Sequence, residues 1–120
     1  MKDALYERVK ILEENDVISH KVADYTRRVI DRLLEEIPNL TQDKVEMFIT
    51  HLAMAGKRAE EGEWETPIDS EILAAVKAET IFPKAIQLRD SLLSGTDIVF
   101  PEAEKDFLSV HICNLLNQEG

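Results

Sequence analysis

The chain has 120 residues, 44% of them hydrophobic and 32% charged, a composition that suits one soluble globular domain and excludes a disordered chain. The net charge of −10 argues against direct binding to nucleic acid or to an anionic membrane surface, since both depend on Lys and Arg. The single cysteine, Cys113, excludes an intramolecular disulfide. No apolar run approaches the roughly 20 residues of a membrane-spanning helix, so we expect a cytoplasmic protein.

The first half of the chain predicts three helices, each with apolar residues spaced by three and four. The expected ranges are 3–14, 20–36 and 42–61. Ser19 and Thr41 stand where N-caps of the second and third helices are needed. Gly62 follows the third helix, at a position where glycine commonly ends a helix.

The second half predicts a fourth helix, beginning at Asp69 or Ser70, that Pro83 must kink or break before a second piece over 84–93. The last helix is apolar almost all round, which is typical of a helix in the middle of a bundle. Its residues expected to be buried are Phe107, Leu108, Val110, Ile112 and Leu115. We therefore expect an all-α fold, a compact five-helix bundle forming a single domain over residues 1–120.

The three histidines have different surroundings. His51 lies at the edge of the apolar face of its helix, while His111 lies on the apolar face of the last helix, seven residues after Glu104. His20 opens a helix among polar neighbours, as a surface residue does. A separate seam with spacing of four, three and four comprises Met47, His51, Met54 and Arg58. Two interpretations of His51 and His111 remain open: structural residues with satisfied hydrogen bonds, or a nucleophilic pair that the fold brings together.

Other chemistry is not indicated. His111 and Cys113 are two residues apart, so on a helix their side chains point in different directions, and there is no second cysteine for a zinc site. The chain has no phosphate-binding glycine loop and no visible set of acid, base and nucleophile. We expect no metal, no cofactor and no enzymatic activity.

Two segments resemble the histidine motifs of the PTS regulation domain (PRD) family. The first comprises Phe48-Ile49-Thr50-His51-Leu52 and continues through Ala55 and Arg58 to Gly62. The second comprises Pro101, Glu104, Phe107-Leu108, His111-Ile112 and Asn114. The family often has Asp before the first histidine, where this chain has Thr50. The resemblance spans nearly the whole chain, with the motifs in the family's order.

The resemblance implies a five-helix bundle regulated by the bacterial sugar phosphotransferase system (PTS). By motif, His51 and His111 would accept phosphate, and Arg58, Glu104 and Asn114 would support the site. The donor would be the histidine-containing phosphocarrier protein or an enzyme II component.

Phosphorylation in this family shifts dimer packing and switches an attached RNA-binding or DNA-binding domain. This chain has no room for such a domain, so it would act on a separate transcription regulator, sense phosphotransferase flux by dimerising, or have lost phosphorylation. The seam around His51 and the family's habit predict a homodimer. His51 and His111 should then face each other across one groove, near Arg58 and Glu104, with at least one ring partly exposed. Arg58 could pair with the phosphoryl group. The alternative is a helical protein-interaction module with structural histidines and no phosphate transfer.

Overall fold

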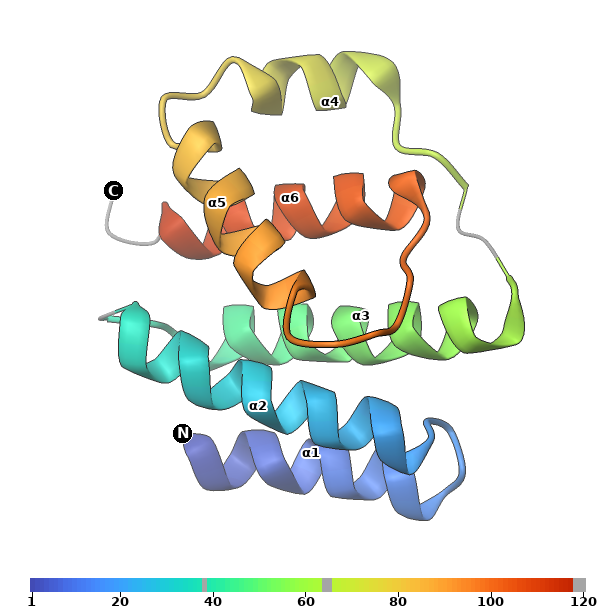
Figure 1. Ribbon diagram of the computed structural model, residues 1–120. Coiled ribbons are helices and arrows are strands. Elements are labelled where there is room, and N and C mark those ends of the chain that lie inside the picture. Colours follow the sequence, from blue (N-terminus) through green and yellow to red (C-terminus); the bar gives the residue numbers. More distant parts are fainter. Residues whose placement is uncertain (38, 64–65, 118–120) are drawn as a thin grey trace.

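The computed structural model describes residues 1–37, 39–63 and 66–117, which form six α-helices and no β-strand (Figure 1). The helices are α1 (Lys2–Glu14), α2 (His20–Glu36), α3 (Gln42–Glu61), α4 (Ser70–Lys77), α5 (Phe82–Leu93) and α6 (Glu102–Leu116). Figure 1 shows α6 between α3 and α4, with α5 crossing it, while α1 and α2 form the opposite end. The all-α class is as expected. None of the helices in the described part combines the length and apolar character needed to cross a membrane.

The ends of α2, α3 and α4 follow from local signals. The Ser19 hydroxyl accepts a hydrogen bond from the backbone N–H of Val22, so it caps α2 as predicted. The Asp69 carboxylate caps α4 by accepting bonds from the N–H groups of Glu71 and Ile72. Gly62 ends α3 with a left-handed φ of 71°, a conformation that costs glycine little. These signals explain why the bounds of α2 and α3 match the expected ranges.

The expected count of five helices is wrong, because the interrupted fourth helix is two separate helices. α4 ends at Lys77, and α5 begins at Phe82 and runs in a different direction (Figure 1). Pro83 lies in the first turn of α5, where its missing N–H has no intrahelical acceptor to lose and its fixed φ suits a helix start. The proline therefore begins a new helix two residues earlier than the expected position 84.

The core lies between α1, α2 and α3 on one side and α5 and α6 on the other. The last helix contributes Leu108, Ile112 and Leu115, as expected, and also Cys113. Phe107 and Val110 were expected inside and are only partly buried. Phe107 packs against the His51 ring, which is itself only partly buried, and Val110 lies three residues further along α6.

Helices α2 and α3 approach closely at Gly56. A Cβ atom at this position would lie 3.0 Å from Cγ1 of Val22 and 3.2 Å from its Cγ2. No larger residue fits without displacing the Val22 side chain. The contact fixes α3, which carries His51, against α2.

Candidate functional site

A groove of about 640 Å³ runs along the exposed face of α3. α3 packs against both α1 and α6, so residues of three helices line the groove. The lining side chains are Arg8 from α1, His111 from α6, and Asp43, Glu46, Met47, Thr50, His51, Met54 and Arg58 from α3. The seam read from the sequence, with His51 at its centre, is therefore one side of this groove.

The groove brings the two candidate histidines together. The ring centroids of His51 and His111 are 4.6 Å apart, and the ring planes are inclined by 43°. Each ring also packs against a phenylalanine ring. The ring centroids of Phe107 and His51 are 5.7 Å apart, and those of Phe48 and His111 are 6.4 Å apart. Both histidines are partly buried, and the His51 side chain is 20% exposed. The two rings thus lie together in the groove, where the His51 side chain is exposed in part but its Nε2 is buried.

A buried ion pair lies beside the histidines. Arg58 donates from Nε to Oε2 of Glu104 at 2.6 Å and from Nη2 to Oε1 at 3.1 Å. Glu104 is completely buried, so this bidentate pairing balances a carboxylate that water cannot reach. Oε1 of Glu104 also lies 4.0 Å from Nε2 of His51. The carboxylate is therefore bonded to the guanidinium of Arg58 and lies near the imidazole of His51 without a hydrogen bond to it.

The environment of His111 favours its neutral form. Burial lowers the pKa of His111 from 6.5 to about 4, with a smaller contribution from the neighbouring His51. The cause is the cost of placing an imidazolium where solvent is scarce. At neutral pH the His111 ring therefore keeps a nitrogen lone pair, as a nucleophile requires.

Arg8 was not predicted as a site residue. Its Nη1 donates to Oγ1 of Thr50 at 3.2 Å, and its Nη2 lies 3.4 Å from Oε2 of Glu46. Thr50 directly precedes His51 in the sequence, and the side chains of Arg8, Thr50 and His51 line the same groove. One feature of the sequence indicated that Arg8 could contact another helix: it is three residues after Leu5, at the edge of the buried face of α1. Nothing local indicates which helix that edge meets.

Comparison with known proteins gives the family of the chain. The family model described as PRD domain matches residues 27–115, which include both histidines, Arg58 and Glu104. The chain belongs to the PRD domain family. A protein of Haemophilus influenzae, described as uncharacterized, is 26% identical over 114 residues, covering 94% of this chain and 89% of that protein. No solved structure matches the chain.

Membership of the PRD family assigns the chain a regulatory role connected with the PTS. The match leaves out α1 and the beginning of α2, so Arg8 lies outside the matched segment. Asn114, named as a supporting residue by motif, is exposed on α6 and is not among the side chains that line the groove. Its role remains a prediction. Within the described residues, no group of three or more His, Cys, Asp or Glu is arranged to hold a metal ion.

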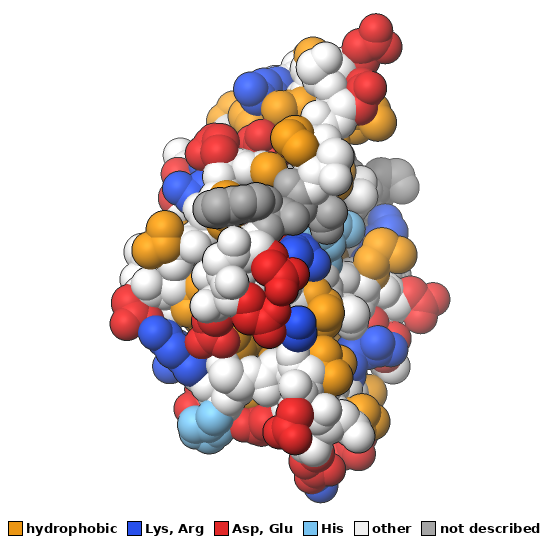
Figure 2. Space-filling model, turned by 90° about the vertical axis from the view of Figure 1, so that its right-hand side faces the viewer, with side chains coloured by type: hydrophobic (Ala, Val, Ile, Leu, Met, Phe, Trp, Pro, Cys, Tyr) orange, Lys and Arg blue, Asp and Glu red, His pale blue; other side chains and the backbone are white. Residues whose placement is uncertain are grey.

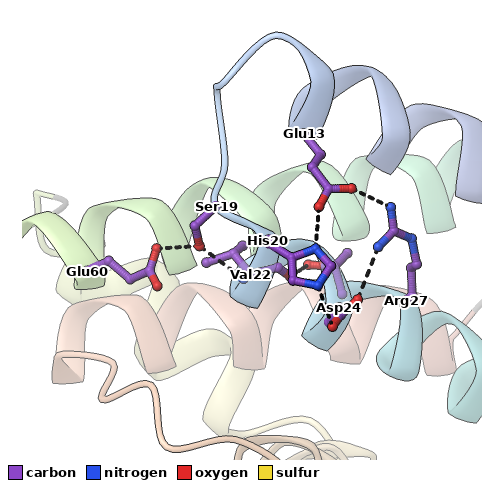
Figure 3. A network of polar contacts seen from close by, with 8 residues as sticks. Glu13, Ser19, His20, Val22, Asp24, Arg27 and Glu60 are labelled. Atoms are coloured by element: carbon purple, nitrogen blue, oxygen red, sulfur yellow. Dashed lines mark hydrogen bonds and ion pairs between the residues drawn. The ribbon is translucent and has the colours of Figure 1, made fainter.

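His20 lies apart from the groove, in a network between α1 and α2 (Figure 3). Its Nδ1 is 2.8 Å from Oε2 of Glu13 and its Nε2 is 3.3 Å from Oδ2 of Asp24. The hydrogen bond with Glu13, followed by the charge of Asp24, raises the pKa of His20 above 6.5. Arg27 also binds Glu13, at 2.7 Å. His20 is a surface residue, as expected, and its contacts hold the start of α2 against α1.

Proposed function

We propose that this PRD domain, over residues 1–120, is a phosphorylation-controlled regulator of bacterial transcription or antitermination in the cytoplasm. Its donor would be the histidine-containing phosphocarrier protein or an enzyme II component of the PTS. The observation that carries the proposal is the pair of imidazole rings, 4.6 Å apart, in a groove open to a second protein. The neutral state of His111 at physiological pH supports it.

The proposed reaction moves a phosphoryl group between two imidazoles. A ring nitrogen of His51 or His111 attacks phosphorus through its lone pair and forms a new N–P bond. The N–P bond of the donor's phosphohistidine breaks, and that nitrogen takes up a proton, while the acceptor ring gives one up. No electrons are exchanged, and neither ring needs a cofactor.

The added charge provides the switch. A phosphoryl group brings about −1.5 to −2 charges to a chain whose net charge is already −10. Figure 2 shows acidic side chains spread over one face of the molecule, with Lys and Arg side chains among them. At the groove, the new charge repels acidic groups of a neighbouring subunit and attracts arginines. We propose that the target of this change is a homodimer contact and, through it, a separate transcription regulator.

The dimer can be tested independently of phosphate transfer. Met47 lines the groove and is 64% exposed, so a dimer contact at the groove would have a large apolar side chain to cover. Analytical ultracentrifugation at tens of micromolar, an order-of-magnitude working range for protein association, should show a dimer. Met47→Glu should weaken it. A wild-type protein that remains monomeric at these concentrations would contradict the dimer proposal.

The decisive experiment for phosphate transfer uses a phosphorylated carrier and four proteins: wild type, His51→Ala, His111→Ala and His20→Ala. The modified residue is mapped by mass spectrometry without acid, since phosphohistidine is acid-labile. We expect wild type and His20→Ala to take up phosphate, with one or both groove variants losing it. If wild type takes up none from carrier or enzyme II while circular dichroism shows intact helices, the phosphoacceptor proposal fails.

One observation favours the alternative function, a helical protein-interaction module. Both imidazoles pack against phenylalanine rings, as structural side chains at the edge of a core do. In that case all four proteins in the transfer experiment remain unmodified. His51→Ala and His111→Ala then lower stability rather than change signalling.

A further inference from the structure

We infer that Arg8, and not Arg58, is the residue that binds the phosphoryl group once it is on His51. The inference rests on the proposed function, since it names the cation that receives the modified ring. It makes α1, which lies outside the matched PRD segment, the helix that senses modification.

Arg58 is committed to another anion. Two of its nitrogens bind the two carboxylate oxygens of Glu104, and the Arg58 side chain is only 19% exposed. If Arg58 turned toward a phosphoryl group, the carboxylate of Glu104 would remain buried without its countercharge. An uncompensated buried charge is strongly destabilising, so Arg58 is not expected to leave Glu104 for a phosphoryl group. The sequence-based expectation that Arg58 receives the phosphate is therefore replaced.

Arg8 is held weakly by comparison. It donates to a neutral hydroxyl of Thr50, and its contact with Glu46 is long, at 3.4 Å. The side chain is 43% exposed, and pairs as exposed as this one contribute little to stability. Glu46 also has a second partner, because its Oε1 accepts a hydrogen bond from Gln42 at 2.9 Å. Arg8 can therefore leave Glu46 at small cost.

The groove requires such a cation. Asp43 and Glu46 line it and oppose a further negative charge. Among the described side chains that line the groove, the cations are Arg8 and Arg58. Nη1 of Arg8 already lies 3.2 Å from Oγ1 of Thr50, which precedes His51 in the sequence and lines the same groove. The guanidinium of Arg8 can bind two phosphoryl oxygens at once. On modification, Arg8 exchanges the carboxylate of Glu46 for the phosphoryl group.

The test uses phosphoramidate, a small-molecule donor, so that no carrier protein needs to dock. The imidazole forms an N–P bond while the N–P bond of phosphoramidate breaks and ammonia leaves with a proton. His20 is 79% exposed and would also react, so every protein in the titration carries His20→Gln, while the unsubstituted protein is treated separately to show that the reagent is active. The phosphorus NMR signal of phospho-His51 is assigned as the one missing from His51→Ala. Titrating that signal gives the second pKa of the phosphoryl group.

A cation beside the phosphoryl group stabilises its dianion and lowers this pKa. We expect Arg8→Gln to raise the pKa by about half a unit or more, roughly a threefold change in proton affinity, and Arg8→Lys to restore part of it. Lys10→Gln is the matched control: it removes the same charge from α1 at an exposed side chain 3.9 Å from Glu14. Its effect should be much smaller.

Equal shifts in Arg8→Gln and Lys10→Gln would overturn the assignment of Arg8 while leaving phosphorylation of His51 intact. If phosphoramidate modifies His20 in the unsubstituted protein but never His51, the acceptor role of His51 and the inference both fail. Thermal melts of each variant show whether the fold is retained. If Arg8→Gln alone fails to fold, Arg8→Lys is compared instead. A phosphoryl pKa on His51 that is the same in Arg8→Lys and Lys10→Gln would then also count against the inference.

Discussion

The carboxylate of Glu104 is completely buried, and the guanidinium of Arg58 balances its charge through two hydrogen bonds. Replacing Glu104 by Gln keeps the size of the side chain but leaves the Arg58 cation without its anion. Removing one member of a buried ion pair costs about 3–5 kcal/mol. Because Arg58 is partly exposed, water can solvate some of its charge, and we expect a loss of about 2–4 kcal/mol.

The measurement is the free energy of unfolding in urea at neutral pH, followed by far-UV circular dichroism. Glu61→Gln is the matched control, because it also removes one negative charge. It breaks the exposed pair with Lys57, at 3.1 Å, and should lower the free energy of unfolding by less than about 1 kcal/mol. The double variant Arg58→Met with Glu104→Gln should cost less than the sum of its single variants, since neither charge is then left alone. A loss for Glu104→Gln no larger than for Glu61→Gln would refute the anchoring role of this pair.

Three further predictions concern stability and titration. NMR titration of His111 should give a pKa of about 4. Because this pKa is lowered from 6.5 in the folded state, protonation favours the unfolded chain. The free energy of unfolding should therefore fall as the pH drops from about 6.5 toward 4. The full shift corresponds to about 3 kcal/mol, which partial exposure reduces to about 1–2 kcal/mol, and His111→Gln should remove this dependence. His20 has a raised pKa, so its contribution is present below about pH 6.5 and is lost as the pH rises through the folded value; NMR should show a pKa above 6.5 that falls in Glu13→Gln. Leu108→Ala should cost about 2–5 kcal/mol in a urea melt, since Leu108 is buried on α6.

Much of the fold could be predicted because its signals are local. Ser19 and Gly62 mark helix ends through bonds and dihedral angles within a few residues, and the bounds of α2 and α3 follow from them. Pro83 was read as an interruption of one helix, yet it begins α5. A proline is compatible with both outcomes, and the choice depends on how α5 packs across α6, which no local pattern contains.

The site shows the same division. The motifs place His51 and His111 on facing sides of one groove, although 60 residues separate them in the sequence. Arg58 and Glu104 were named as neighbours of the site, but not as partners of each other. Arg8 was missed because its place depends on how α1 packs against α3, a contact between segments about 40 residues apart.

The close approach of Gly56 to Val22 has a consequence for how the groove can change shape. Since a methyl group at position 56 would already meet Val22 at 3.0 Å, α2 and α3 have no spare distance between them and must move together. α3, which supplies most of the groove lining, is thus fixed to α2, while α1 and α6 border the groove and carry Arg8 and His111. A signal that begins on His51 can therefore change the width of the groove through a displacement of α1 or α6 relative to α3.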